Sequence, residues 1–141
     1  MKVHLTRRYH FSASHRLHSA ELSEEENRKL YGKCANPYGH GHNYVVEVTV
    51  AGPVEPATGL VANLAELDAF VVREVLEPFD HKYLNEEVGE FRIAVPTTEN
   101  LCREIYRRLK DFPAAGLAGV RIEETAANSF EYRGETREVN A

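Results

Sequence analysis

Three histidines have the spacing of a metal site. His40 and His42 stand two residues apart at the start of a strand-like pattern, so their side chains leave the same face, with Cα atoms about 6.6 Å apart. Gly39 and Gly41 leave room for both imidazole rings to turn. His15 continues the parity of Phe11 in an earlier strand pattern, and a hairpin of the two strands would bring it to His40.

A catalytic zinc ion typically has three protein ligands and one open position, so the three histidines predict a Zn²⁺ site. The alternative is that H-x-H is an exposed polar turn. His4 and His10 have the opposite parity and are expected to face solvent, and no prediction is made for His18.

Cys34 lies six residues before His40, among turn-forming residues. It could be a buried or idle thiol, or a fourth zinc ligand that closes a structural site. It could also stay off the metal as a base or nucleophile. Because three histidines suffice for a catalytic site, the off-metal role is favoured. Cys102 lies in a helical pattern beside Leu101, where a small buried hydrophobe is expected, and nothing suggests a disulfide.

Two carboxylates stand out from their surroundings. Asp80 precedes His81 in a loop, where the pair could be a helix-end polar contact or an acid-base relay in which the carboxylate orients the imidazole. Glu124 ends an apolar stripe in VRIEET. Either the strand has left the sheet there, or the carboxylate accepts two parallel N–H bonds from a guanidine-like heterocycle edge.

The segment Thr97, Thr98 and Glu99 has the pattern of a plain helix start, although its backbone N–H groups could also hold a ligand.

Periodicity predicts strands over residues 3–11, 42–50, 120–125 and 130–133. One helix follows Asn63 and ends at Pro78, and a second runs from PTTEN to the residue before Pro113. A short helical piece, ELSEEENRKL, lies in a long connection over residues 19–39. The order ββααββ predicts an α+β fold, a four-stranded antiparallel sheet with both helices on one face.

Composition sets further bounds. The 141 residues fit one domain, 1–141, that needs no disulfide. With 17 Lys and Arg against 22 Asp and Glu, and no long basic run, nucleic-acid binding is disfavoured. There is no apolar run that could span a membrane and no signal-peptide pattern, so a cytoplasmic location is expected.

These residues together resemble the 6-pyruvoyltetrahydropterin synthase family of tunnelling-fold enzymes. The resemblance runs from about Tyr9 to Glu135 and includes FSASHRL, CANPYGHGHNY, TGLVANLAEL, FDHKYLN, PTTEN and EET with FEYRGE. Five residues separate the cysteine from the first histidine of H-x-H, as in the pyruvoyl-forming synthases. The related 6-carboxytetrahydropterin synthases of queuosine biosynthesis have three.

The resemblance implies a zinc-dependent lyase that converts 7,8-dihydroneopterin triphosphate to 6-pyruvoyltetrahydropterin with loss of triphosphate. It implies zinc on His15, His40 and His42 and Cys34 as the base. It also implies a relay of Asp80 with His81, and Glu124 as the pterin anchor. The expected assembly is a homohexamer, a dimer of trimers with sites at subunit interfaces. Arg16 and Lys33 are candidate triphosphate contacts. The alternatives are the carboxy-forming enzyme and a non-enzymatic, zinc-stabilised binding protein.

Overall fold

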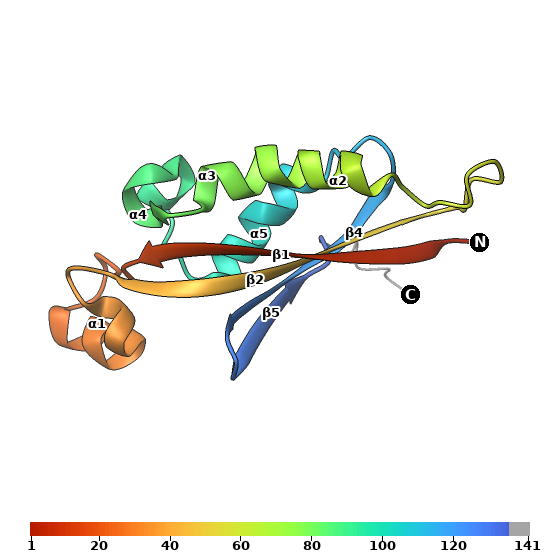
Figure 1. Ribbon diagram of the computed structural model, residues 1–141. Coiled ribbons are helices and arrows are strands. Elements are labelled where there is room, and N and C mark those ends of the chain that lie inside the picture. The colour runs from red at the N-terminus through yellow and green to blue at the C-terminus, as the bar shows by residue number, and fades with distance from the viewer. Residues whose placement is uncertain (136–141) are drawn as a thin grey trace, which may run out of the picture.

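A long antiparallel hairpin forms the middle of the sheet. The computed structural model describes residues 1–135, so the last six residues of the predicted domain lie outside the described part. Strands β1 (Val3–His15) and β2 (His40–Gly52) pair without a break from Val3 opposite Gly52 to His15 opposite His40 (Figure 1). Both strands extend beyond the predicted bounds, because each continues to pair with the other up to the histidines.

The sheet has five strands, in the order β3-β1-β2-β4-β5. Strands β4 (Gly116–Thr125) and β5 (Asn128–Tyr132) form the second hairpin, as predicted. The prediction of four antiparallel strands is wrong in detail: β3 (Lys82–Tyr83) pairs in parallel with β1. Two residues are too short to produce a period in the sequence, so this strand could not be predicted from a pattern.

The first long helix passes through the proline that was expected to end it. Its three continuous segments are α2 (Leu64–Val71), a π-helical turn (Val72–Leu76) and α3 (Glu77–Phe79). Pro78 has no N–H to offer the preceding turn, and the carbonyl of Glu74 instead accepts a bond from Arg108 at 3.4 Å. The helix therefore ends one residue later than predicted.

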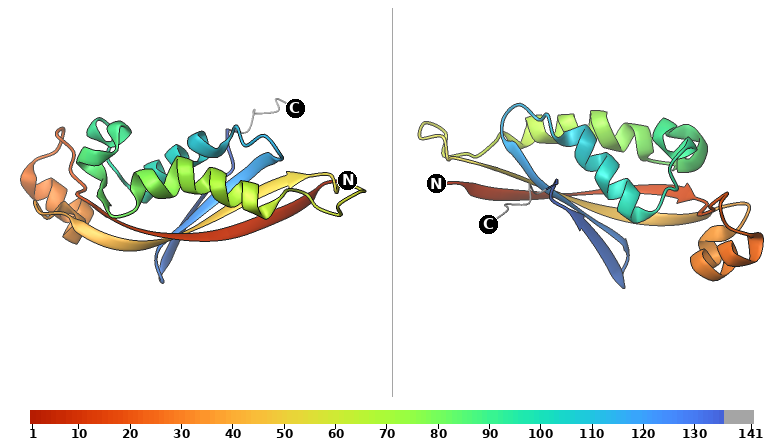
Figure 2. Two further views of the ribbon diagram at one scale, coloured as in Figure 1. Left: turned by 45° about the horizontal axis from the view of Figure 1, so that its top comes forward. Right: turned by 180° about the vertical axis from the view of Figure 1, so that it is seen from behind.

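Helix α5 (Thr98–Leu109) packs beside this first helix on the same face of the sheet, and Figure 2 shows both layered over that face. The α+β class is thus as predicted. The order ββααββ is not confirmed, because α1 (Glu24–Tyr31) lies between β1 and β2, and β3 and α4 (Leu84–Glu87) lie between the two long helices. Apolar side chains of both helices and of the sheet form one core, which includes Tyr44, Val71, Leu101, Ile105 and Ile122. On β1, Phe11 and Ala13 are buried whereas His4 and His10 are exposed, which confirms the expected parity.

Within residues 1–135, four shorter helical pieces complete the order. Helix α1 (Glu24–Tyr31) lies at the end of the β1–β2 hairpin and begins with a capping box of Ser23 and Glu26. A 3-10 turn (Gly32–Ala35) follows it. Helix α4 (Leu84–Glu87) and a 3-10 turn (Gly89–Arg92) connect β3 to α5.

Within residues 1–135, no helix combines the length and the apolar character needed to cross a membrane.

Candidate metal and pterin site

Three histidine rings gather where β1 and β2 end. His15 and His40 are paired across the hairpin, and His42 lies two residues further along β2. The ring centroids of His15 and His42 are 4.9 Å apart and those of His40 and His42 are 4.7 Å apart. The hairpin thus brings the three predicted ligands to one place, as the parity of the two strands indicated.

His15 is fully buried, and its hydrogen bonds fix its tautomer. Nδ1 lies 2.8 Å from the carbonyl oxygen of Pro96, and a carbonyl can only accept, so Nδ1 carries the proton. Nε2 then has a free lone pair, and it is the one buried side-chain nitrogen or oxygen within residues 1–135 that has no hydrogen-bond partner. Burial lowers the pKa of His15, which favours the neutral form that metals bind.

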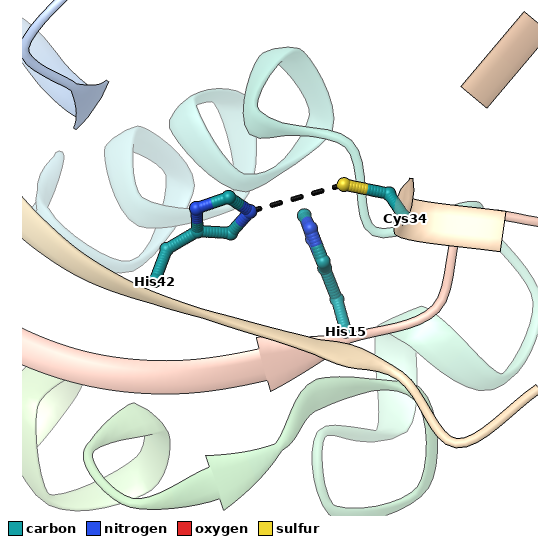
Figure 3. Close-up of side chains that lie close together, drawn as sticks. All are labelled: His15, Cys34 and His42. Atoms are coloured by element: carbon teal, nitrogen blue, oxygen red, sulfur yellow. Dashed lines mark hydrogen bonds between the residues drawn. The ribbon is translucent and has the colours of Figure 1, made fainter. Parts of the chain in front are cut away.

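Cys34 lies closer to the histidines than a purely off-metal role would require. It is on the 3-10 turn after α1, with Sγ 3.9 Å from Nε2 of His42 (Figure 3). The ligand atoms of His15, Cys34 and His42 all lie within 4.8 Å of one another, and His40 does not belong to this tightest group. Burial raises the pKa of the Cys34 thiol, and the charge of Glu124 raises it further.

Residues that sequence reasoning missed hold the cysteine turn against the strands. The backbone N–H of Leu17 donates to the carbonyl of Cys34 at 2.6 Å. The side-chain amide of Asn85 both accepts from the N–H and donates to the carbonyl of Arg16, each at 2.8 Å. Asn85 lies in the motif FDHKYLN, for which the sequence predicted a role only for Asp80 and His81.

Gly39 has φ of 82° and lies against the end of β1. A Cβ added there would lie 3.2 Å from the carbonyl oxygen of His15 and 3.3 Å from the Tyr83 ring. Only glycine combines that conformation with so close an approach. The Gly-His-Gly-His segment therefore needs Gly39 for its backbone conformation, in addition to the histidines for their chemistry.

Glu124 lies beside the histidine cluster at an irregularity in the β4–β5 pairing. Bulges of this kind re-aim side chains. One carboxylate oxygen accepts a bond from the hydroxyl of Thr98, which is buried in the first turn of α5. The other lies 3.5 Å from Nδ2 of Asn128. The negative charge of Glu124 affects the pKa values of His15, Cys34 and His42, which places it within their electrostatic reach.

The residues at the start of α5 cap the helix and also contact the carboxylate of Glu124. Thr97 is the N-cap, and its hydroxyl accepts from the backbone N–H of Asn100 at 3.2 Å. Thr98 contacts Glu124, whereas Glu99 is exposed. The segment is therefore the helix start expected from the sequence, and one of its members also touches the candidate pterin anchor.

Asp80 and His81 form the expected contact. Nδ1 of His81 lies 3.0 Å from an Asp80 carboxylate oxygen, and the other carboxylate oxygen accepts from the N–H of Ser12 at 2.9 Å. That backbone bond lowers the pKa of Asp80. The His81 side chain is 81% exposed and lines a hollow with Ser12, Asn43 and His42. Within residues 1–135 it makes no contact with Cys34.

The donor set at the hairpin end fits a zinc ion. Two neutral imidazoles and a thiol converge, a third imidazole lies next to them, and a buried lone pair of His15 has no protein partner. Nitrogen and sulfur donors of this kind are those that zinc prefers. The bond from Nδ1 to Pro96 is the outer contact that commonly orients a metal-binding histidine.

Comparison with known proteins agrees with this chemistry. Residues 4–135 match the family described as 6-pyruvoyl tetrahydropterin synthase. Human 6-pyruvoyl tetrahydrobiopterin synthase is 49% identical over 135 residues, which cover 95% of this chain and 93% of the human protein. A putative 6-carboxy-5,6,7,8-tetrahydropterin synthase of Archaeoglobus fulgidus is 36% identical over 94 residues, 67% of this chain and 75% of that protein. The structure of Caenorhabditis elegans 6-pyruvoyl tetrahydropterin synthase superposes with a TM-score of 0.90 at 42% identity and covers 96% of this chain and 97% of that one.

Proposed function

Because the chain belongs to the 6-pyruvoyl tetrahydropterin synthase family and is a lyase of that type, we propose that it is a zinc-dependent enzyme. Its substrate is 7,8-dihydroneopterin triphosphate, which loses triphosphate to give 6-pyruvoyltetrahydropterin. The observation that carries the metal part of this proposal is the buried, partnerless Nε2 of His15, which lies between His42 and Cys34.

His15, His40 and His42 would hold the zinc ion. When bound there, the ion supplies a positive charge that polarises the side-chain hydroxyls of the substrate. The protein prepares the site in advance, since the bond to Pro96 sets the tautomer of His15 before any metal arrives. Burial keeps His15 and His42 in the neutral form.

Cys34 would take a proton from a side-chain carbon of the substrate. Its 3.9 Å distance from His42 places it beside the metal position. Burial and Glu124 hold its pKa high in the protein alone, so ionisation of the thiol would depend on a bound positive charge nearby. The substrate side chain then rearranges internally and triphosphate leaves, with no net oxidation.

Glu124 would anchor the pterin ring. A carboxylate can accept two parallel hydrogen bonds from neighbouring N–H groups of the heterocycle, and Thr98 holds this carboxylate in place. The start of α5 at Thr97, Thr98 and Glu99 would border the bound ring.

The Asp80–His81 relay would serve a site in a neighbouring subunit. Asp80 orients the imidazole within the chain, and the His81 side chain is 81% exposed. Within residues 1–135 no hydrogen bond or ion pair joins His81 to Cys34, so the exposed imidazole is available to a neighbouring subunit. This placement supports a homo-oligomer with sites between subunits, and the proposed assembly is the homohexamer. The cytoplasmic location and the single domain over residues 1–141 stay predictions.

Two rivals remain to be distinguished. The archaeal relative named a 6-carboxy-tetrahydropterin synthase makes the carboxy-forming reaction the nearest alternative, and with it a role in queuosine synthesis. The second rival is a closed structural zinc site with Cys34 as a ligand, which the 4.8 Å grouping favours more than the sequence did.

One experiment tests the proposed reaction. The zinc-loaded protein is incubated with 7,8-dihydroneopterin triphosphate, and the pterin product is identified by mass. The 6-pyruvoyl product with released triphosphate is expected, and chelation should abolish its formation. A 6-carboxy product would establish the first rival, and no turnover with full zinc occupancy would favour the second.

A further inference from the structure

A small hollow lined by two arginines lies between α1 and the 3-10 turn that carries Cys34. Its volume is about 60 Å³. The residues that line it come from the segment after β1, from α1 and from the turn that carries Cys34: Arg16, His18, Glu24, Asn27, Arg28, Ala35 and Pro37.

The hollow adjoins the candidate active site along the chain. Arg16 follows His15 directly, and Ala35 follows Cys34, so in each case neighbouring Cα atoms are about 3.8 Å apart. Nε of Arg16 donates to the carbonyl of Ala35 at 3.4 Å. Asn85 fixes the Arg16 backbone through two bonds of 2.8 Å, so the position of this arginine is set by the same contacts that hold the site together.

The positive charge in the hollow has no carboxylate that pairs with it. Within residues 1–135, neither Arg16 nor Arg28 lies within ion-pair distance of an Asp or Glu. Lys29, the next residue on α1, is paired with Glu25 at 3.5 Å. Glu24 also lines the hollow, so two arginines and one glutamate are among its lining residues. In a chain of net charge -5, such a local excess of positive charge beside an active site indicates an anionic ligand.

We propose that Arg16 and Arg28 hold a phosphoryl group of the substrate's triphosphate. This inference rests on the proposed function, because it assigns the phosphate end of the same substrate. The guanidinium fork matches phosphate oxygens and can donate two parallel bonds. A hollow of about 60 Å³ suits a single phosphoryl group, so the rest of the triphosphate extends along the surface. His18 also lines the hollow.

The test measures binding of tripolyphosphate to the zinc-loaded protein by titration calorimetry. Arg28→Gln removes one guanidinium and should weaken binding about tenfold, the usual value of a charge-assisted bond. Lys29→Gln is the matched control, because it removes the same charge from the same last helical turn but lies outside the hollow. Zinc content is measured after each titration, since polyphosphates also bind zinc. Equal weakening by both variants, or by neither, would overturn the proposal.

A kinetic measurement gives an independent readout. Arg28→Gln should raise KM for the triphosphate substrate about tenfold and leave kcat within about twofold, because uniform binding is lost. Binding of 7,8-dihydroneopterin, which has no phosphates, should be unchanged. Arg16→Lys keeps the positive charge but loses the forked guanidinium group, so its KM should lie between those of the wild type and Arg28→Gln. If the wild type forms no pyruvoyl product but tripolyphosphate binding still depends on Arg28, the proposed reaction fails while the anion site stands.

Discussion

Strand β1 carries two polar clusters on the face that the helices cover, and they differ in one respect. Near its start, Nε and one terminal nitrogen of Arg7 donate to the two carboxylate oxygens of Asp68 on α2, each at 3.0 Å, and the hydroxyl of Tyr9 donates to Asp68 at 2.7 Å. Every partner in this cluster is another side chain of the chain itself. At its end, His15 has one nitrogen satisfied and the other buried without a partner.

The difference separates a structural cluster from a functional one. Buried polar groups in folded proteins are nearly always hydrogen-bonded, and an unpaired one costs free energy. The Arg7–Asp68–Tyr9 cluster meets that requirement internally and needs nothing from outside. Within residues 1–135 the His15 cluster does not, and a ligand that accepts the lone pair of Nε2 would complete it. Substitutions in the first cluster should therefore change stability, and those in the second should change chemistry.

The largest expected effect is that of Cys34→Ala on turnover. Loss of a general base lowers rates by about 10² to 10⁴, and we expect a fall of about 10³ in kcat with the melting temperature unchanged. Cys102→Ala is the control, because this thiol on α5 is buried against β4 and β5, and burial raises its pKa to about 12. That variant should lose stability but keep its turnover per folded molecule. Full activity of Cys34→Ala would refute the mechanism.

Metal removal comes next. A ligand present at 1,000 times its Kd stabilises a folded protein by about 4 kcal/mol, so zinc should raise the melting temperature clearly. The metal-free chain should nevertheless stay folded by circular dichroism, because its apolar core also takes in β4 and both long helices. Unfolding on chelation is the outcome expected of the structural rival and would contradict a catalytic site.

Glu124→Gln should raise KM for the pterin substrate by about 10- to 100-fold, since charge-assisted bonds to the ring would be lost. Zinc content should not change. Glu123→Gln is a matched control, because Glu123 lies on the opposite face of β4 and pairs with Arg121 at 3.0 Å. Steady-state kinetics of both variants would show the contrast. An equal KM for the two variants would show that Glu124 does not bind the pterin ring.

The smallest effect is expected for Asp68→Asn, and it is confined to stability. Bonds from Arg7 and Tyr9 lower the pKa of Asp68, so the carboxylate stabilises the fold when ionised. The advantage of the wild type should be complete at neutral pH. It should decline as the pH falls below about 3.8, the ordinary aspartate pKa, and disappear below the lowered pKa. Urea unfolding of both proteins between pH 7 and pH 3 would measure this, with kcat at pH 7 expected to be equal.

The sequence predicted those parts of the fold whose patterns are long. Alternation over β1 and β2 gave the hairpin and the parity of its histidines, and Leu101, Ile105 and Leu109 gave the buried face of α5. Strand β3 was missed because two residues have no period. Pro78 was expected to end a helix that passes through it, because the bond from Arg108 to Glu74 depends on tertiary packing.

The structure brings several of the predicted site residues together, but their arrangement could not be predicted. Parity and the hairpin placed His15 beside His40, and a carboxylate at the end of an apolar stripe marked Glu124. The sequence could not show that Cys34 lies within the tightest ligand group while His40 lies outside it. It also could not show that the His81 side chain is 81% exposed beside Asp80, because both depend on how loops fold back onto the strands.

The central claim is that zinc occupies the histidine end of the hairpin with Cys34 off the metal, and the most direct test is the absorption spectrum of the cobalt-substituted protein. Three histidines without a thiolate predict tetrahedral cobalt bands, no sulfur-to-cobalt charge transfer in the near ultraviolet, and an identical spectrum for Cys34→Ala. A charge-transfer band that disappears in Cys34→Ala, together with loss of metal, would place the thiolate on the metal and contradict the account.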